Sequence, residues 1–213
     1  MSEGTVAGRV PGKRLPPGRH GLSRAQVGES QRQRLLAASA KCLAERGYGQ
    51  ITLTEVAKTA GVSTATFYQH FEDLRACLLT AYEAGAERLC RASESACGEA
   101  GGNPEERARA GTAAALALLA SEPSLSHLLS GEPPPQATAL WAARLRLTGR
   151  LAALLAAVRG DPPGGKAEPR LIGAALTLVS RRVRAEGAER LGELTPSLTE
   201  ILLAARSESP RGT

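Results

Sequence analysis

The stretch ITLTEVAKTAGVSTATFYQHF, residues 51–71, decides the fold. Thr52 is followed three residues later by Glu55, which is the pattern of a capping box at the start of a helix. Apolar residues then recur at helical spacing as far as Gly61, and glycine is typical of a helix end. Ser63 stands where it can cap a second short helix. Two short helices joined by a tight turn predict a helix-turn-helix unit.

The composition extends the helical prediction to the whole chain. Its 213 residues include 38 Ala and 30 Leu but only 8 Val and 3 Ile. Ala and Leu favour helices, whereas a β-sandwich or a parallel α/β sheet needs β-branched residues for its strands. The predicted fold class is therefore all-α, and the length allows one large domain or two small ones.

Capping residues and Gly/Pro breaks predict about nine helices. The first should begin at Ser30, with Gln33 completing a capping box, and the fourth should follow Asp73 and run to about Ala96. The remaining helices are expected at 104–121, after Pro123, and at about 136–159, 168–186 and 195–206. We therefore expect a flexible basic arm over 1–28, a three-helix DNA-binding domain over 29–73, a larger helical domain over 74–206 and a disordered tail over 207–213.

The positive charge is concentrated near the N-terminus. The chain carries a formal charge of +6, of which +5 falls within residues 1–75. A local basic excess points to a polyanionic partner such as nucleic acid, although a solvated surface without a partner would look the same. Arg19 and Arg24 precede the first predicted helix, so they could form a minor-groove arm or belong to a solubilising tail.

Several other classes of protein fit poorly. The N-terminus has no apolar core of a signal peptide and no segment is long enough to span a bilayer, so we expect a cytoplasmic protein with reduced thiols. The three histidines are scattered and the sequence lacks the common catalytic and phosphate-binding motifs, so we predict neither an enzyme nor a cofactor or metal site.

The second short helix has the residue types that a DNA-reading helix needs. Thr64 and Thr66 are small and polar on its first turn, where they can reach base edges. Tyr68 and His70 carry donors for backbone phosphates, and the phenylalanines at 67 and 71 form the opposite, buried face. The alternative is an ordinary helical hairpin packed in a core.

The same stretch resembles the TetR family of bacterial transcriptional regulators. The resemblance rests on VA…AGVS at 56–63, on FYxHF at 67–71 and on the helix that carries Leu78, and it covers about residues 30–85. It implies a homodimer that binds a palindromic operator and is released by a small molecule bound in the C-terminal helical domain. The DNA contacts that it implies are Thr52, Thr54, Ser63, Thr64, Ala65, Thr66, Tyr68 and His70. The family usually has a lysine at the position of Leu74, so either Arg75 replaces that contact or it is lost.

The C-terminal half offers weaker candidates. His127, Trp141 and Arg144 are the polar candidates for a ligand site, each of which could equally be structural. The helix expected near 168–187 is apolar nearly all round and should pair, with the last helix, against a second copy of itself; a core helix within one chain is the alternative. The predicted interface residues are Leu171, Ala175, Leu178, Val179, Leu198, Ile201 and Leu202.

The sequence thus favours a DNA-binding transcriptional repressor that responds to a small apolar or amphipathic molecule. A DNA-binding regulator or architectural protein without a ligand is the first alternative, and a small all-α enzyme is the second.

Overall fold

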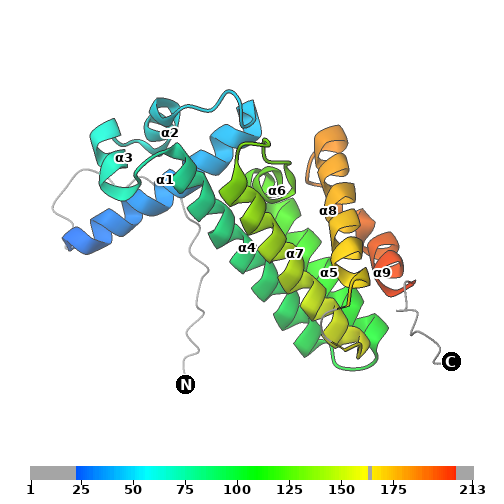
Figure 1. The fold of residues 1–213 in the computed structure, drawn as a ribbon. Coiled ribbons are helices and arrows are strands. Elements are labelled where there is room, and N and C mark those ends of the chain that lie inside the picture. The colour runs from blue at the N-terminus through cyan, green and yellow to red at the C-terminus, as the bar shows by residue number, and fades with distance from the viewer. Residues whose placement is uncertain (1–22, 163–164, 205–213) are drawn as a thin grey trace, which may run out of the picture. The chain divides into compact units, whose positions relative to one another are not determined.

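The structure, a computed structural model, describes residues 23–162 and 165–204 (Figure 1). Over these ranges the chain forms nine α-helices and one short 3-10 helix without any strand, which confirms the all-α fold class. Among the same residues no helix combines the length and the apolarity that a membrane crossing requires. Arg19 and the tail predicted at 207–213 lie outside the described residues.

The chain divides into two compact units, one ending at Ala81 and the other beginning at Tyr82. The division falls within α4 (Leu74–Glu99), so this helix contributes its first two turns to the N-terminal unit and the rest to the C-terminal unit.

The N-terminal unit contains α1 (Arg24–Arg46), α2 (Leu53–Ala60), α3 (Thr64–His70) and the start of α4. The predicted caps are confirmed here. The side chains of Thr52 and Ser63 accept hydrogen bonds from the backbone of Glu55 and Thr66, and the Asp73 carboxylate accepts one from the amide of Ala76 at 2.7 Å.

The prediction for the start of α1 was wrong. The helix begins at Arg24, and its capping box is formed by Ser23 and Gln26 instead of Ser30 and Gln33. Arg24 is therefore the first residue of a helix and not part of an extended arm. The added turns lie beside α3, because a Cβ atom at Gly28 would lie 3.8 Å from a ring carbon of His70.

The core of the N-terminal unit is formed by one apolar face from each helix. Leu35 of α1, Val56 of α2, Phe67 of α3 and Cys77 of α4 are all fully buried. Burial of these faces fixes the two helices of the helix-turn-helix against α1 and the start of α4.

The C-terminal unit is a bundle built around the remainder of α4. It contains α5 (Pro104–Ser121), α6 (Pro123–Ser130), α7 (Thr138–Arg159), α8 (Ala167–Glu186), the 3-10 helix η1 (Leu191–Leu194) and α9 (Thr195–Ala204). Helix α7 packs against α8, and α5 packs against α9 (Figure 1). The predicted Asn103 cap with Pro104 at the first helical position is confirmed.

Two glycines permit close contacts between helices of this bundle. A Cβ atom at Gly85 of α4 would lie 2.4 Å from a methyl carbon of Leu125 on α6, and one at Gly111 of α5 would lie 2.3 Å from the sulfur of Cys97 on α4. A larger residue at Gly85 would require the Leu125 side chain to move, and one at Gly111 would also meet the backbone carbonyl oxygen of Ser93 at 3.2 Å, so α4 lies close to both α5 and α6.

Helix α8 buries one face within the protomer and is not enclosed on all sides. Ile172, Leu176, Val179 and Val183 are buried, whereas Leu178 is 37% exposed. The buried stripe packs against α6, α7 and α9, and the other face stays exposed in the protomer, so the alternative of a core helix enclosed within one chain is wrong. Pairing of the exposed face with a second copy stays a prediction.

Candidate DNA-reading surface and interior cavity

Helix α3 separates a buried face from an exposed polar face. Phe67 is fully buried, but the next residue, Tyr68, is 62% exposed. Thr64 and Ala65 on the first turn are also exposed. The surface available to a partner is therefore the one that the sequence predicted, with small side chains at the helix start and a phenol hydroxyl one turn later.

The start of α3 is organised by Ser63. Its hydroxyl accepts a hydrogen bond from the amide of Thr66 at 3.0 Å and lies 2.9 Å from the hydroxyl of Thr66. Thr52 and Thr54 at the start of α2 are exposed, and the Thr52 hydroxyl donates to the Glu55 carboxylate at 3.0 Å. Both helix starts thus present hydroxyl groups to solvent in defined positions.

His70 lies differently from the prediction. It is half-buried at the end of α3, where its ring faces Gln31 of α1. The guanidinium carbon of Arg32 lies 5.0 Å from the centre of the neighbouring Phe71 ring. Both contacts attach the end of α3 to α1, which makes His70 a contact within the unit as well as a candidate phosphate donor.

Arg34 is a positioning residue that the sequence did not reveal. Its guanidinium donates a hydrogen bond of 2.8 Å to the carbonyl oxygen of Ala60, 26 residues away. Gly61 follows with φ +67°, the left-handed conformation that glycine adopts without strain. No local pattern marks Arg34, because its partner is a backbone atom of another helix.

Several exposed residues border α2 and α3. Arg75 is exposed and makes no ion pair with any described residue. Leu74 is half-buried and carries no charge, so it cannot make the phosphate contact that the resemblance implies for a lysine at this position. Gln69 on α3 and Lys58 on α2 are exposed too, although neither was predicted as a site residue. The helical wheel of each segment would have shown them on the solvent side.

The C-terminal unit contains an apolar cavity of about 110 Å³. Five helices line it, with Leu89 from α4, Leu116 from α5, Leu155 from α7, Leu176 from α8 and Leu202 from α9 among the lining residues. Such a cavity favours a hydrocarbon group and offers little to a charged one.

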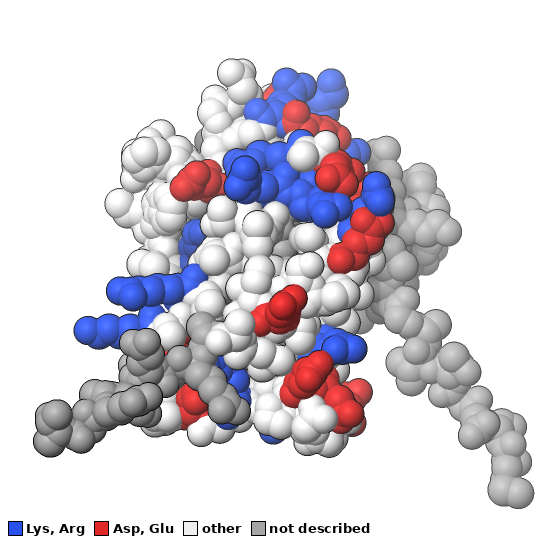
Figure 2. All heavy atoms as spheres, turned by 90° about the vertical axis from the view of Figure 1, so that its right-hand side faces the viewer, with Lys and Arg blue, Asp and Glu red and all other residues white. Residues whose placement is uncertain are grey.

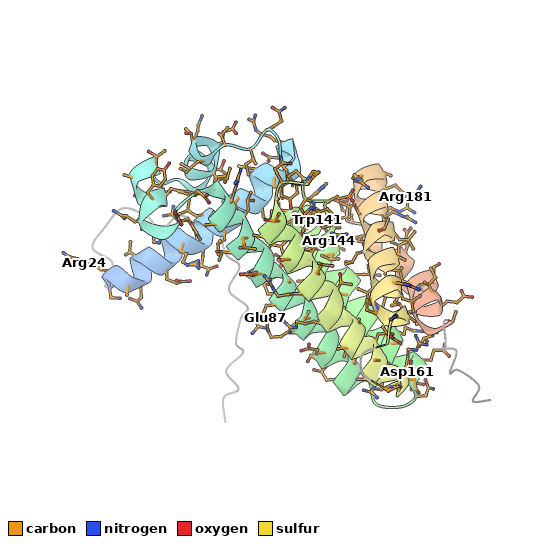
Figure 3. All side chains as sticks on the ribbon, viewed as in Figure 1. Arg24, Glu87, Trp141, Arg144, Asp161 and Arg181 are labelled. Atoms are coloured by element: carbon orange, nitrogen blue, oxygen red, sulfur yellow. The ribbon has the colours of Figure 1, made fainter. Side chains whose placement is uncertain are left out.

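None of the three predicted ligand residues lines this cavity. Trp141 and Arg144 lie near the start of α7, at the opposite end of the helix from Asp161 (Figure 3). Arg144 donates hydrogen bonds of 3.2 Å to the carbonyl oxygens of Leu129 and Gly131, at the end of α6, which accounts for it as a structural residue. His127 is half-buried on α6.

Tyr82 lies beside Arg144 at the start of the C-terminal unit. The ring is fully buried. Burial raises the pKa of its hydroxyl to about 12, an effect that the charge of Arg144 partly opposes. Tyr82 therefore stays neutral at physiological pH and acts as a core residue.

The predicted dimer residues fall into two groups. Val179, Leu198 and Leu202 are buried within the protomer and line the cavity, so they are not free to form an interface. Leu178 is exposed, and the side chains at 171, 175 and 201 are partly exposed. Uncharged side chains cover much of the centre of this side of the molecule, as Figure 2 shows.

The described residues do not group three His, Cys, Asp or Glu side chains in a way that could hold a metal ion.

Most of the N-terminal unit matches a known protein family. Residues 35–81 match the family described as bacterial regulatory proteins, tetR family. No curated protein sequence matches the chain.

Solved structures share the fold over most of the chain at low sequence identity. The fatty acid degradation regulator FadR from Bacillus halodurans is 19% identical, with a TM-score of 0.70 over 92% of this chain and 100% of its own. The FadR of Bacillus subtilis, solved in complex with stearoyl-CoA, is 19% identical, with a TM-score of 0.68 over 80% of this chain and 97% of its own. The TetR-family regulator PfmR from Thermus thermophilus is 20% identical, with a TM-score of 0.58 over 82% of this chain and 100% of its own. Residues 35–81 therefore match the tetR family of bacterial regulatory proteins, and the part of the chain that the structure describes shares the fold of these solved regulators.

Proposed function

We propose that this protein is a ligand-responsive transcriptional repressor that binds a palindromic DNA operator as a homodimer. The observation that supports it best is the exposed polar face of α3, where Thr64, Ala65 and Tyr68 stand opposite the buried Phe67. A helix with this arrangement can enter the major groove with small side chains toward the bases. The proposal places the protein on DNA in the bacterial cytosol.

In this proposal the N-terminal unit reads the DNA. Thr64, Ala65 and Thr66 face base edges, while Thr52, Thr54, Ser63, Tyr68, His70 and Arg75 bind the sugar–phosphate backbone. Arg24 lies at the exposed start of α1, the helix whose Gln31 faces His70 of α3, and adds a further phosphate contact in this proposal.

The C-terminal unit dimerises and binds the effector. The exposed side chains of α8 and α9, Leu178 among them, form the interface in this proposal, because an exposed leucine is stabilised by burial against a second copy. The proposed effector has an apolar portion that enters the cavity. The stearoyl-CoA bound to the Bacillus subtilis FadR is one example of such an amphipathic molecule.

The size of the cavity favours a second candidate function. Pockets for small ligands usually measure about 300–1,000 Å³, and this one measures about 110 Å³. A DNA-binding regulator without a small-molecule effector would need no larger space. The effector of the first candidate must therefore either insert only a short segment or expand the cavity.

Selection of bound fragments from a random DNA pool tests the DNA part. The proposal predicts an inverted repeat with a fixed half-site spacing, and binding that weakens steeply with salt. Recovery of sequences without a repeat would contradict the dimeric operator.

Analytical ultracentrifugation tests the interface. Leu178→Glu should convert the dimer to a monomer, whereas the matched control Leu145→Glu, at a leucine 70% exposed on α7, should leave it dimeric. A wild-type protein that sediments as a monomer would exclude the homodimer.

A further inference from the structure

One threonine in the cavity wall, Thr112, lacks the hydrogen bond that four other helical threonines make. Thr80, Thr148, Thr177 and Thr199 each donate their hydroxyl to the carbonyl oxygen four residues earlier, at 2.7 to 2.9 Å. This bond is the usual way in which a helical threonine satisfies its hydroxyl. Thr112 of α5 makes no such bond, and its hydroxyl has no partner among the described residues.

The other polar groups of the cavity wall are already used. The Ser93 hydroxyl donates to the carbonyl oxygen of Leu89 at 3.1 Å, and the Cys97 thiol contacts the carbonyl oxygen of Arg107 at 3.3 Å. The remaining 16 of the 19 lining residues are apolar. Thr112 therefore supplies the one hydroxyl in this lining that is free to donate.

We propose that Thr112 determines ligand specificity by donating a hydrogen bond to one hydroxyl or carbonyl oxygen on an otherwise hydrocarbon chain. This inference rests on the proposed effector site and names the chemical class of its ligand. A purely apolar chain leaves the Thr112 hydroxyl without a partner, whereas a chain with an oxygen at the matching carbon satisfies both groups. The cavity is smaller than the roughly 150 Å³ that holds a benzene ring, so the enclosed segment has fewer than about six carbon atoms.

Calorimetric titration of the full chain with octanoate and with its 3-, 5- and 7-hydroxy derivatives tests this inference. The carboxylate can remain in water while the chain enters, and the hydroxyl samples three depths. One derivative should bind about tenfold more tightly than octanoate, equivalent to about 1.4 kcal/mol. Thr112→Val should remove this preference and Thr112→Ser should keep it. The control Thr148→Val should keep it too, because Thr148 lies outside the cavity lining and its hydroxyl is already bonded to the carbonyl oxygen of Arg144.

The outcomes separate this inference from the proposed function. If octanoate binds but no derivative is preferred, or if Thr112→Val keeps the preference, the role of Thr112 is wrong and the effector site stands. If none of the four chains binds, the inference is overturned together with the effector site, whereas operator binding, measured separately, is unaffected. Thermal unfolding of each variant verifies that it is folded.

Discussion

Arg34 of α1 donates a hydrogen bond of 2.8 Å to the carbonyl oxygen of Ala60, the last residue of α2. The carbonyl groups in the last turn of a helix lack helical partners, and a positive charge at that end is favoured by the helix dipole. The bond therefore ties α1 to the turn that leads into α3. The orientation of α3 therefore depends on a residue far from it in the sequence.

Replacement of Arg34 should weaken the N-terminal unit. Arg34→Met should lower the free energy of unfolding by about 1–2 kcal/mol, because a charge-assisted hydrogen bond that is partly shielded from water is lost. Urea unfolding measures this change in the free energy of unfolding. The control is Lys41→Met on the same helix, whose ion pair with Glu45 is exposed and should cost less than about 0.5 kcal/mol. Equal effects of the two substitutions would contradict the assigned role.

Replacement of Gly61 by a residue with a side chain should lower the stability of the N-terminal unit. Its φ of +67° costs an L-residue about 1–2 kcal/mol, so Gly61→Ala should reduce stability by that amount. Gly149→Ala is the matched control, because Gly149 lies inside α7 with no atom within 4 Å of an added Cβ. Gly149→Ala should raise the free energy of unfolding by about 0.5–1 kcal/mol. Thermal or urea unfolding distinguishes the two signs.

The ion pairs between α4 and α7 should make stability depend on acid pH. Arg150 hydrogen-bonds Glu87 and lies 3.4 Å from Glu94, and the Arg150 bond is the main cause of a lowered pKa for Glu87. The stabilisation is therefore complete above the ordinary glutamate pKa of 4.5 and is lost as the pH falls through the lowered value.

Wild type and Glu87→Gln should accordingly differ in stability at pH 7 and converge on acidification. In the Arg150→Gln background the same substitution should have a smaller pH-dependent effect, because only the ion pair of Glu87 with Arg91 remains. A difference between wild type and Glu87→Gln that stays constant from pH 7 to pH 3 would be incompatible with this pairing.

The four cysteines should be unreactive in the folded protein. Cys42, Cys77, Cys90 and Cys97 are all free and buried. Burial raises the pKa of Cys77 to about 11 and raises those of Cys90 and Cys97 as well. At pH 8 a disulfide reagent should label none of them quickly in buffer and all four in urea. Rapid labelling of a native thiol would show that its helix opens readily.

Local signals in the sequence were enough to predict most of the fold. Thr52, Ser63, Asp73 and Asn103 cap helices where expected, because a capping bond joins residues only three apart. The predicted start of α1 was wrong because the correct start depends on a contact between residues far apart in the sequence. The sequence contains two similar boxes, Ser23–Gln26 and Ser30–Gln33, and the approach of Gly28 in the added turns to His70 is a long-range one.

The two candidate sites also differ in whether a local pattern of residues reveals them. The exposed face of α3 follows from helical spacing, so Thr64 and Tyr68 could be predicted from sequence. The cavity is assembled from five helices, and its lining is apolar, so the search for polar candidates led to His127, Trp141 and Arg144 instead. Thr112 was missed because no sequence pattern shows that its hydroxyl lacks a hydrogen-bond partner among the described residues.

The most direct test is the affinity of α3 variants for the DNA selected from a random pool, measured by fluorescence anisotropy at fixed salt. Thr64→Val should weaken binding to the selected site about 5- to 100-fold, because a base contact contributes about 1–3 kcal/mol, while binding to unrelated DNA stays the same. The control Thr138→Val, at an exposed threonine at the start of α7, should bind as wild type does. If Thr64→Val binds the selected site as tightly as Thr138→Val does, α3 does not read DNA through its first turn.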